Sequence, residues 1–268
     1  MITSAKNPKI HWLHSLQTSS KARREEALFV VEGVRLAEEA LQAGWRARLV
    51  LYSDDLSPRG QAVVAGFAAQ GAPVEEAAPA ALRAASDTET PQGLLVAIEW
   101  RPLPLPERLD FVLVADAVRD PGNLGTLLRT AAAAGAQALL LPPETADAFA
   151  PKVLRAGMGA HFRLPVQGLD WDALAARLAG LQVFLAAAGE AQSRPCYAAN
   201  FRQPLALIVG GEAEGAGLPA QRLAGQRVSI PMPGGGESLN VAVAAGILLF
   251  EVVRQRQGYK NLSGPDQT

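Results

Sequence analysis

The sequence predicts an α/β protein of two domains, the second of them built on a mostly parallel sheet. The chain has 268 residues, which is long for one domain and comfortable for two. Short apolar runs alternate with segments of helical spacing along most of its length, which is the pattern of layered α/β folds. A proline-rich segment at residues 101–108, RPLPLPER, interrupts this alternation, because prolines at alternate positions exclude a helix interior or a central strand.

The proline-rich segment divides the chain. We expect a first domain over residues 1–100, an extended linker over 101–109, a second domain over 110–260 and a flexible tail over 261–268. In the first domain, apolar runs predict strands at residues 28–31, 48–52, 73–75 and 94–99. The spacing of apolar and small residues predicts helices between them, at residues 34–43, 61–69 and 79–85.

The second domain repeats the alternation with more strongly apolar strands. Strands are predicted at residues 111–115, 138–141, 163–166, 183–187, 205–209 and 227–230, and helices at 123–135, 150–156, 171–179 and 239–256. Because strands that are apolar throughout are buried on both faces, we expect a mostly parallel sheet with helices on both sides. The last helix is apolar on nearly every face and must be buried, which makes contact with a second chain a reasonable expectation.

Composition excludes several classes of protein. The formal net charge is −1 and charged residues make up 19%, which excludes a disordered or strongly basic chain. The single Cys196 excludes a disulfide framework and a cysteine-based zinc site, and we expect no metal. The N-terminus lacks the apolar segment of a signal peptide, and the longest apolar run, at residues 241–250, is too short to span a bilayer. We therefore expect a cytoplasmic protein with no membrane partner.

The N-terminus carries a block of basic residues. Residues 1–24 contain no Asp or Glu, and their cations include Lys21, Arg23 and Arg24. Clustered Lys and Arg side chains are typical of phosphate contacts with nucleic acid. A solvated N-terminal helix is the alternative interpretation.

The segment at residues 116–136, DAVRDPGNLGTLLRTAAAAGA, is the first candidate for a functional site. Asp116 ends a predicted strand, and Asn123 is a suitable N-cap for the helix that follows. Arg129 lies on a helix face of small residues, which leaves room for a bulky group to approach. A surface arginine beside a tightly packed helix pair is the alternative.

Two glycine-rich loops follow the last two predicted strands. The first, GGEAEG at residues 210–215, lies where open α/β sheets bind ligands, yet it matches neither the dinucleotide fingerprint nor the phosphate loop. There, Glu212 is expected to orient a hydroxyl or an amide. The second, IPMPGGGESLN at residues 230–240, offers Met232 and Leu239 as apolar walls of a pocket, whereas Ser238 could simply cap the last helix.

Together these segments resemble the three motifs of the SpoU (TrmH-like) ribose 2′-O-methyltransferases of the SPOUT superfamily. Residues 123–131, NLGTLLRTA, are similar to the first motif, 208–215 to the second and 229–244 to the third. Residues 151–166 also resemble the family, although Gly157 stands where a serine is frequent. Residues 7–41 look like the small RNA-binding domain that precedes the catalytic domain in many members.

The resemblance implies a specific fold and activity. Members use S-adenosylmethionine to methylate a ribose 2′-OH of ribosomal or transfer RNA, and their catalytic domain forms a deep trefoil knot and a homodimer. The domain arrangement resembles members that act on large-subunit ribosomal RNA. The alternatives are a transfer RNA methyltransferase and a non-catalytic RNA-binding member of the fold.

The resemblance also assigns residues to roles. Motif matching implies cofactor contacts from the two loops, namely Gly210, Gly211, Gly215, Ile230, Met232, Ser238 and Leu239. It implies a polar cluster around the reacting ribose, formed by Arg129, Asn123, Glu212, Asn240 and Ser238. Because a guanidinium is normally held protonated, we favour Arg129 as a cation that stabilises developing alkoxide charge, with transient base action as the alternative. Contacts with RNA are expected from Lys21, Arg23, Arg24, Lys152 and Arg155.

Overall fold

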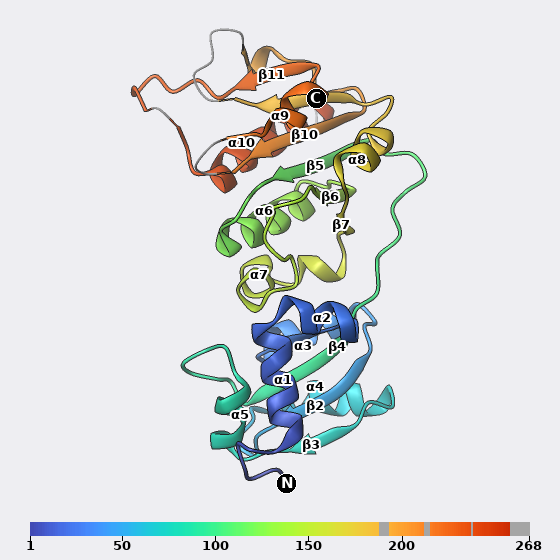
Figure 1. Ribbon diagram of the computed structural model, residues 1–268, viewed down its shortest axis with the longest axis vertical. Helices are drawn as coiled ribbons and strands as arrows, with labels where there is room; N and C mark the ends of the chain where they lie inside the picture. The colour runs from blue at the N-terminus through green and yellow to red at the C-terminus, as the bar shows by residue number, and fades with distance from the viewer. Residues whose placement is uncertain (188–192, 212–214, 237, 258–268) are drawn as a thin grey trace, which may run out of the picture. The chain divides into compact units, whose positions relative to one another are not determined.

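The computed structural model describes residues 1–187, 193–211, 215–236 and 238–257 (Figure 1). The chain forms two compact units. The first consists of Met1–Pro102 together with Asp147–Arg163, and the second of Leu103–Ala146 together with Leu164–Thr268. Residues 101–109 form neither helix nor strand. The tail predicted at residues 261–268 lies outside the described residues.

A four-stranded mixed sheet forms the centre of the first unit. Its strand order is β1 (Leu28–Glu32), β4 (Leu94–Glu99), β2 (Ala47–Tyr52) and β3 (Val74–Glu76). Strand β4 is antiparallel to both β1 and β2, whereas β2 and β3 are parallel. The helices of this unit before the linker are α1 (Pro8–Thr18), α2 (Ser20–Glu26), α3 (Val34–Gln42), α4 (Pro58–Ala69) and α5 (Pro79–Ala85).

The start of helix α4 differs from the prediction. The helix begins at Pro58, three residues before the predicted start at Gln61, because Ser57 caps it and Pro58 occupies its first turn. The Ser57 hydroxyl accepts a hydrogen bond from the Gly60 N–H at 3.2 Å. Proline lacks the N–H that a first helical turn leaves unpaired, so it suits this position.

The segment Asp147–Arg163 leaves the second unit and completes the first. It contains helix α7 (Pro151–Gly157) and the 3-10 helix η1 (Ala160–Phe162). Its Phe149 and Phe162 rings lie 5.0 and 6.3 Å from the Phe29 ring of β1, between centroids. A single second domain over residues 110–260 does not describe this excursion, since the segment packs with the first unit.

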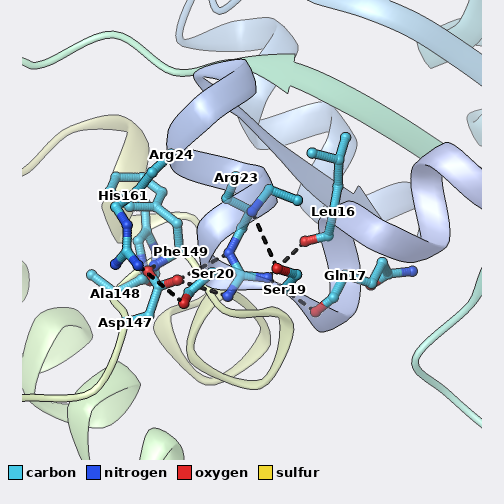
Figure 2. A network of polar contacts seen from close by, with 11 residues as sticks. Leu16, Gln17, Ser19, Ser20, Arg23, Arg24, Asp147, Ala148, Phe149 and His161 are labelled. Atoms are coloured by element: carbon cyan, nitrogen blue, oxygen red, sulfur yellow. Dashed lines mark hydrogen bonds and ion pairs between the residues drawn. The ribbon is translucent and has the colours of Figure 1, made fainter.

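A buried ion pair joins the segment Asp147–Arg163 to the N-terminal helices of the first unit. Arg23 is only 8% exposed and donates two hydrogen bonds to the Asp147 carboxylate, at 2.7 and 3.0 Å. It also donates to the carbonyl oxygens of Leu16 and Gln17 at the end of α1, as Figure 2 shows. A buried guanidinium with these partners stabilises the local structure, because removal of either charge would leave the other unpaired.

The second unit contains the predicted parallel sheet, and this part of the fold prediction is confirmed. Its strands are all parallel and run in the order β7 (Val166–Gly168), β6 (Ala138–Leu141), β5 (Phe111–Asp116), β10 (Leu205–Gly210), β8 (Gln182–Ala186), β11 (Gln226–Ser229) and β9 (Arg194–Pro195). The strand predicted at 163–166 is wrong: β7 starts only at Val166, since Pro165 has no N–H for the sheet.

Helices α6 (Pro121–Ala133), α8 (Trp171–Arg177), α9 (Leu218–Leu223) and α10 (Val241–Gln257) belong to the second unit, with the 3-10 helix η2 (Cys196–Ala198). Helices α6 and α10 pack together, and a Cβ on Gly246 would lie 3.6 Å from Cγ2 of Thr130. The single chain does not bury every face of α10, which was expected to be buried with contact to a second chain. Val243, Ile247 and Phe250 are 52%, 42% and 49% exposed. None of the helices in the described part of the chain is long and apolar enough to cross a membrane.

Candidate functional site

A cavity of about 530 Å³ opens at the carboxyl ends of three neighbouring strands in the second unit. Val209 and Gly210 contribute the end of β10, Ala186 the end of β8, and Val228 the end of β11. Helix α10 closes another side through residues that include Leu248. Ligands of open α/β sheets bind at such strand ends, and the volume suits a molecule of cofactor size.

The cavity contains every residue that the sequence predicts to contact a cofactor. Its lining includes both glycine-rich loops, with Gly210, Gly211, Gly215, Ile230, Met232, Ser238 and Leu239. Glycine backbone exposes N–H and C=O groups, whereas the larger side chains form apolar walls. The structure therefore brings the two loops together at one cavity.

The glycines at the end of β10 are required by close backbone packing. A Cβ on Gly210 would lie within 3.0 Å of backbone atoms of Gly215 and Ala216. A Cβ on Gly211 would come as close to the carbonyl oxygen of Ala117. These glycines allow the close backbone contacts at the end of β10, where Gly210, Gly211 and Gly215 line the cavity.

Asp116 anchors this loop, a role that the sequence interpretation missed. It is the last residue of β5, pairs in register with Gly210 and is 4% exposed. Its Oδ2 accepts a hydrogen bond from the Gly217 N–H at 2.7 Å. Burial raises the pKa of Asp116 above its ordinary 3.8; the Gly217 N–H opposes this shift and the Glu144 carboxylate adds to it. A carboxylate that ends an apolar strand was the available signal in the sequence.

We expect Asp116→Ala to weaken S-adenosylmethionine binding about three- to tenfold, since one hydrogen bond that orders the loop is lost. Asp116→Asn keeps an acceptor oxygen and should bind normally in the same calorimetric titration. Equal affinities in the Ala variant and the parent chain would contradict this role.

The Asn variant also tests the raised pKa of Asp116. A raised pKa favours the neutral acid in the folded state, so its stabilisation is complete below the ordinary Asp pKa and is lost as the pH rises through the folded value. We therefore expect the free energy of unfolding of the parent chain to fall relative to that of Asp116→Asn as the pH rises from the ordinary Asp pKa through the pKa in the folded state. Denaturant titrations from acidic to neutral pH measure the difference, and a pH-independent difference would contradict the shift.

A pair of asparagines lies at the edge of the cavity. The Asn240 Nδ2 donates a hydrogen bond to Asn123 Oδ1 at 2.9 Å, which joins α6 to the start of α10. Asn240 Oδ1 also accepts from the N–H groups of Ala242 and Val243, so Asn240 rather than Ser238 caps α10. The expected capping role of Asn123 is wrong as well: Asp120 caps α6 by accepting from the Asn123 N–H at 2.8 Å.

The remaining predicted catalytic residues differ in position. Ser238 lines the cavity with Asn240. Arg129 is exposed on α6, outside the cavity lining, and has no hydrogen-bond or ion-pair partner among the described residues. Glu212 lies outside the described residues.

The predicted RNA contacts differ in their exposure. Lys21, Arg24 and Lys152 are exposed, although Lys21 lies 3.7 Å from Glu25 and Arg24 donates to the Ser20 hydroxyl. Arg155 forms an ion pair with Asp87 at 2.8 Å. Arg23 is a correction, because its buried guanidinium is held by Asp147 and two carbonyl oxygens and is not available to a phosphate (Figure 2).

Comparison with known proteins agrees with this geometry. Residues 110–250 match the model of the SpoU rRNA Methylase family. Residues 7–96 match the model of the MRM3-like substrate binding domain. The two matches leave residues 1–6, 97–109 and 251–268 uncovered.

Individual relatives align over most of the chain. The Bacillus subtilis 23S rRNA (guanosine(2553)-2′-O)-methyltransferase RlmP is 34% identical, over 94% of this chain and 98% of that protein. The mitochondrial rRNA methyltransferase 3A of Danio rerio is 36% identical, over 90% of this chain and 67% of that protein. The AdoMet-bound rRNA methyltransferase from Sinorhizobium meliloti superposes with a TM-score of 0.83 at 34% identity, covering 94% of this chain and 96% of that one.

Proposed function

The chain belongs to the SpoU rRNA methylase family, and from that membership we propose that it methylates a ribose 2′-OH of ribosomal RNA with S-adenosylmethionine. The observation that carries the proposal is the meeting of both glycine-rich loops and the Asn123–Asn240 pair at one cavity. An adventitious cavity would not collect the three motif segments from such distant parts of the sequence.

The residues of the cavity fit S-adenosylmethionine. The close approach of Gly210 and Gly211 to neighbouring backbone leaves main-chain polar groups at the cavity, which suit the polar edge of adenine. Ile230, Met232 and Leu239 offer apolar contacts to the adenine faces. When bound, the cofactor supplies a methyl group on a sulfonium, which is an electrophile for an alcohol.

The polar residues around the cavity account for the rest of the reaction. Methyl transfer to an alcohol is an in-line displacement, so residues that hold the ribose near the cavity supply much of the rate. We assign this orienting role to Asn123, Asn240 and Ser238, with Glu212 as a further orienting carboxylate. To Arg129 we assign the stabilisation of the negative charge that develops on the 2′ oxygen, the role of a cation beside a developing alkoxide.

Ribosomal RNA is the favoured substrate because the named relatives act on it. The Bacillus subtilis relative is a 23S rRNA methyltransferase, and the first unit of this chain matches a substrate-binding domain. Exposed Lys21, Arg24 and Lys152 are suited to phosphate contacts. Transfer RNA is the alternative substrate.

The direct test is transfer of a labelled methyl group from S-adenosylmethionine to ribosomal RNA, with transfer RNA as the parallel substrate. We expect label in ribosomal RNA at a 2′-O position. Binding of the methyl donor without transfer to either RNA would favour a non-catalytic RNA-binding protein. Calorimetric binding of NAD instead of the methyl donor would overturn the proposal.

We also propose that the chain forms a homodimer through helix α10. One face of the helix packs inside the second unit, through residues that include Leu248, Leu249 and Val252. The other exposes Val243, Ile247 and Phe250, which lie three or four residues apart and share a side of the helix. A contiguous exposed apolar strip of this kind marks an interface.

Charge on this strip should therefore dissociate the dimer. We expect Ile247→Glu to raise the dimer dissociation constant at least about tenfold, since a carboxylate would be buried without a partner. Leu218→Glu is the matched control, because Leu218 is 65% exposed and belongs to a different helix, α9. Sedimentation velocity measures both, and a parent chain that stays monomeric would refute the proposal.

A further inference from the structure

The first unit contains its own cavity of about 390 Å³. Its walls come from the end of β1, the first turns of α3, the loop before β4 and the end of α7. The lining residues are Glu32, Gly33, Arg35, Leu36, Glu39, Thr88, Thr90, Gln92, Arg155 and Met158. All of them belong to the first unit, so this cavity is separate from the one beside β10.

The carboxylates of this cavity are already bonded. Glu32 accepts hydrogen bonds from the hydroxyls of Ser86 and Thr88, and from the Asp87 N–H at 3.1 Å. Glu39 forms an ion pair with Arg163. The charge of Glu39 is therefore balanced by Arg163, and three uncharged donors of the protein stabilise the Glu32 carboxylate.

Two arginines of the lining remain accessible. Arg35 is exposed and has no ion-pair or hydrogen-bond partner among the described residues. Arg155 forms one ion pair with Asp87, and its side chain stays 35% exposed where it lines the cavity.

The start of helix α3 adds to the positive character of the same cavity. Gly33 precedes the helix at a φ of 90° and makes no capping hydrogen bond of its own, and the first turn of the helix contains no acidic residue. Gln92 Oε1 accepts from the Val34 N–H at 3.2 Å. The partial positive charge of the helix start thus lies beside Arg35, which favours an anion.

We propose that this cavity takes one unstacked nucleotide of the RNA substrate. Arg35 and Arg155 bind its phosphate, whereas Leu36 and Met158 contact the base. Thr90 and Gln92 offer polar groups to the edge of the base. Single-stranded RNA is recognised by pockets that combine a cation with a surface for one base. The inference rests on the proposed function, since it makes the first unit a reader of the RNA that the second unit methylates.

The test uses the full chain with two pocket variants. Arg35→Ala removes a phosphate contact. Met158→Gly removes an apolar wall at a residue whose φ is 48°, a left-handed conformation that glycine adopts without strain, so the fold is retained. For both, we expect the KM for ribosomal RNA to rise at least about tenfold, with kcat at saturating RNA and affinity for S-adenosylmethionine unchanged.

Arg48→Ala is the matched control, because Arg48 is an exposed arginine of the first unit outside the cavity. Equal rises in KM for Arg35→Ala and Arg48→Ala would overturn the proposal, since a general loss of charge would then explain both. An unchanged KM in Met158→Gly would exclude a base contact and also overturn it.

Small probes identify the ligand and separate this inference from the proposed function. Titration with nucleoside 5′-monophosphates should perturb NMR signals of Arg35 and Met158, and inorganic phosphate should perturb them more weakly. Perturbation by monophosphates with an unchanged RNA KM in both variants would mean a site for free nucleotides and would overturn the RNA assignment. If the parent chain methylates no RNA, filter binding of RNA to the same variants still decides whether the cavity reads RNA.

Discussion

Replacing Arg129 with alanine is expected to abolish methyl transfer while leaving S-adenosylmethionine affinity nearly unchanged. Arg129 is exposed on α6 and is not part of the cavity that both glycine-rich loops line. Loss of its side chain should therefore not alter the cofactor contacts. Charge developing on the 2′ oxygen would lose its cation, and removal of one such group costs about a hundred- to a thousandfold in kcat.

Two further variants decide how Arg129 acts. Arg129→Lys keeps the charge without the planar guanidinium, so partial activity in that variant would favour the electrostatic role over bidentate phosphate binding. Arg222→Ala on α9 is the matched control for loss of an exposed arginine from the same unit. Single-turnover rates with labelled cofactor, beside calorimetric affinities, measure the effect. Near-normal turnover in Arg129→Ala would refute the assignment.

The parallel sheet was predictable because strands that are buried on both faces are apolar at nearly every position in the sequence. Strands such as β5 and β10 are apolar at nearly every position, which only a doubly covered sheet requires. The order of the strands in the sheet was not predictable, because the apolar character of a strand does not indicate which other strand it pairs with. The trefoil knot stays a prediction from the resemblance.

The excursion of residues 147–163 could not be predicted for the same reason. Phe149 and Phe162 signal burial, but nothing local indicates that they pack against Phe29 rather than within their own domain. The buried Arg23 was misread because an arginine in a basic block suggests solvent and phosphate. Its true partner, Asp147, is distant in sequence, and tertiary pairing overrides the local pattern.

The sequence was sufficient to predict which residues line the cavity beside β10. It was not sufficient to predict the hydrogen bonds that hold those residues in place. Glycines after strands are a local signal, so Gly210 and Gly211 could be identified without a structure. The bond from Gly217 to Asp116 spans residues far apart in sequence, and only the pairing of β5 with β10 brings them together. The N-cap of α6 also differs from the one predicted. Asp120 and Asn123 are both residue types that cap helices, and Pro121 in the first turn identifies Asp120 as the N-cap.

Replacing Gly210 with alanine should strongly weaken S-adenosylmethionine binding. The added Cβ would lie within 3.0 Å of Gly215 and Ala216 backbone atoms, which cannot move aside as the end of a flexible side chain could. The backbone of Gly215 and Ala216 must therefore shift away from the end of β10. Overpacking of this kind costs about 1–3 kcal/mol, equivalent to a roughly five- to hundredfold loss of affinity if the strain falls on the cofactor-binding conformation.

Gly234→Ala is the matched control, because it lies in the second glycine-rich loop and a Cβ there would meet no atom within 4 Å. Calorimetric titration should show near-normal affinity in this variant and strongly weakened binding in Gly210→Ala. Denaturant unfolding separates strain in the loop from collapse of the sheet: a retained cooperative transition would locate the effect in the loop. Equal affinities in the two variants would mean that close packing at Gly210 does not govern cofactor binding.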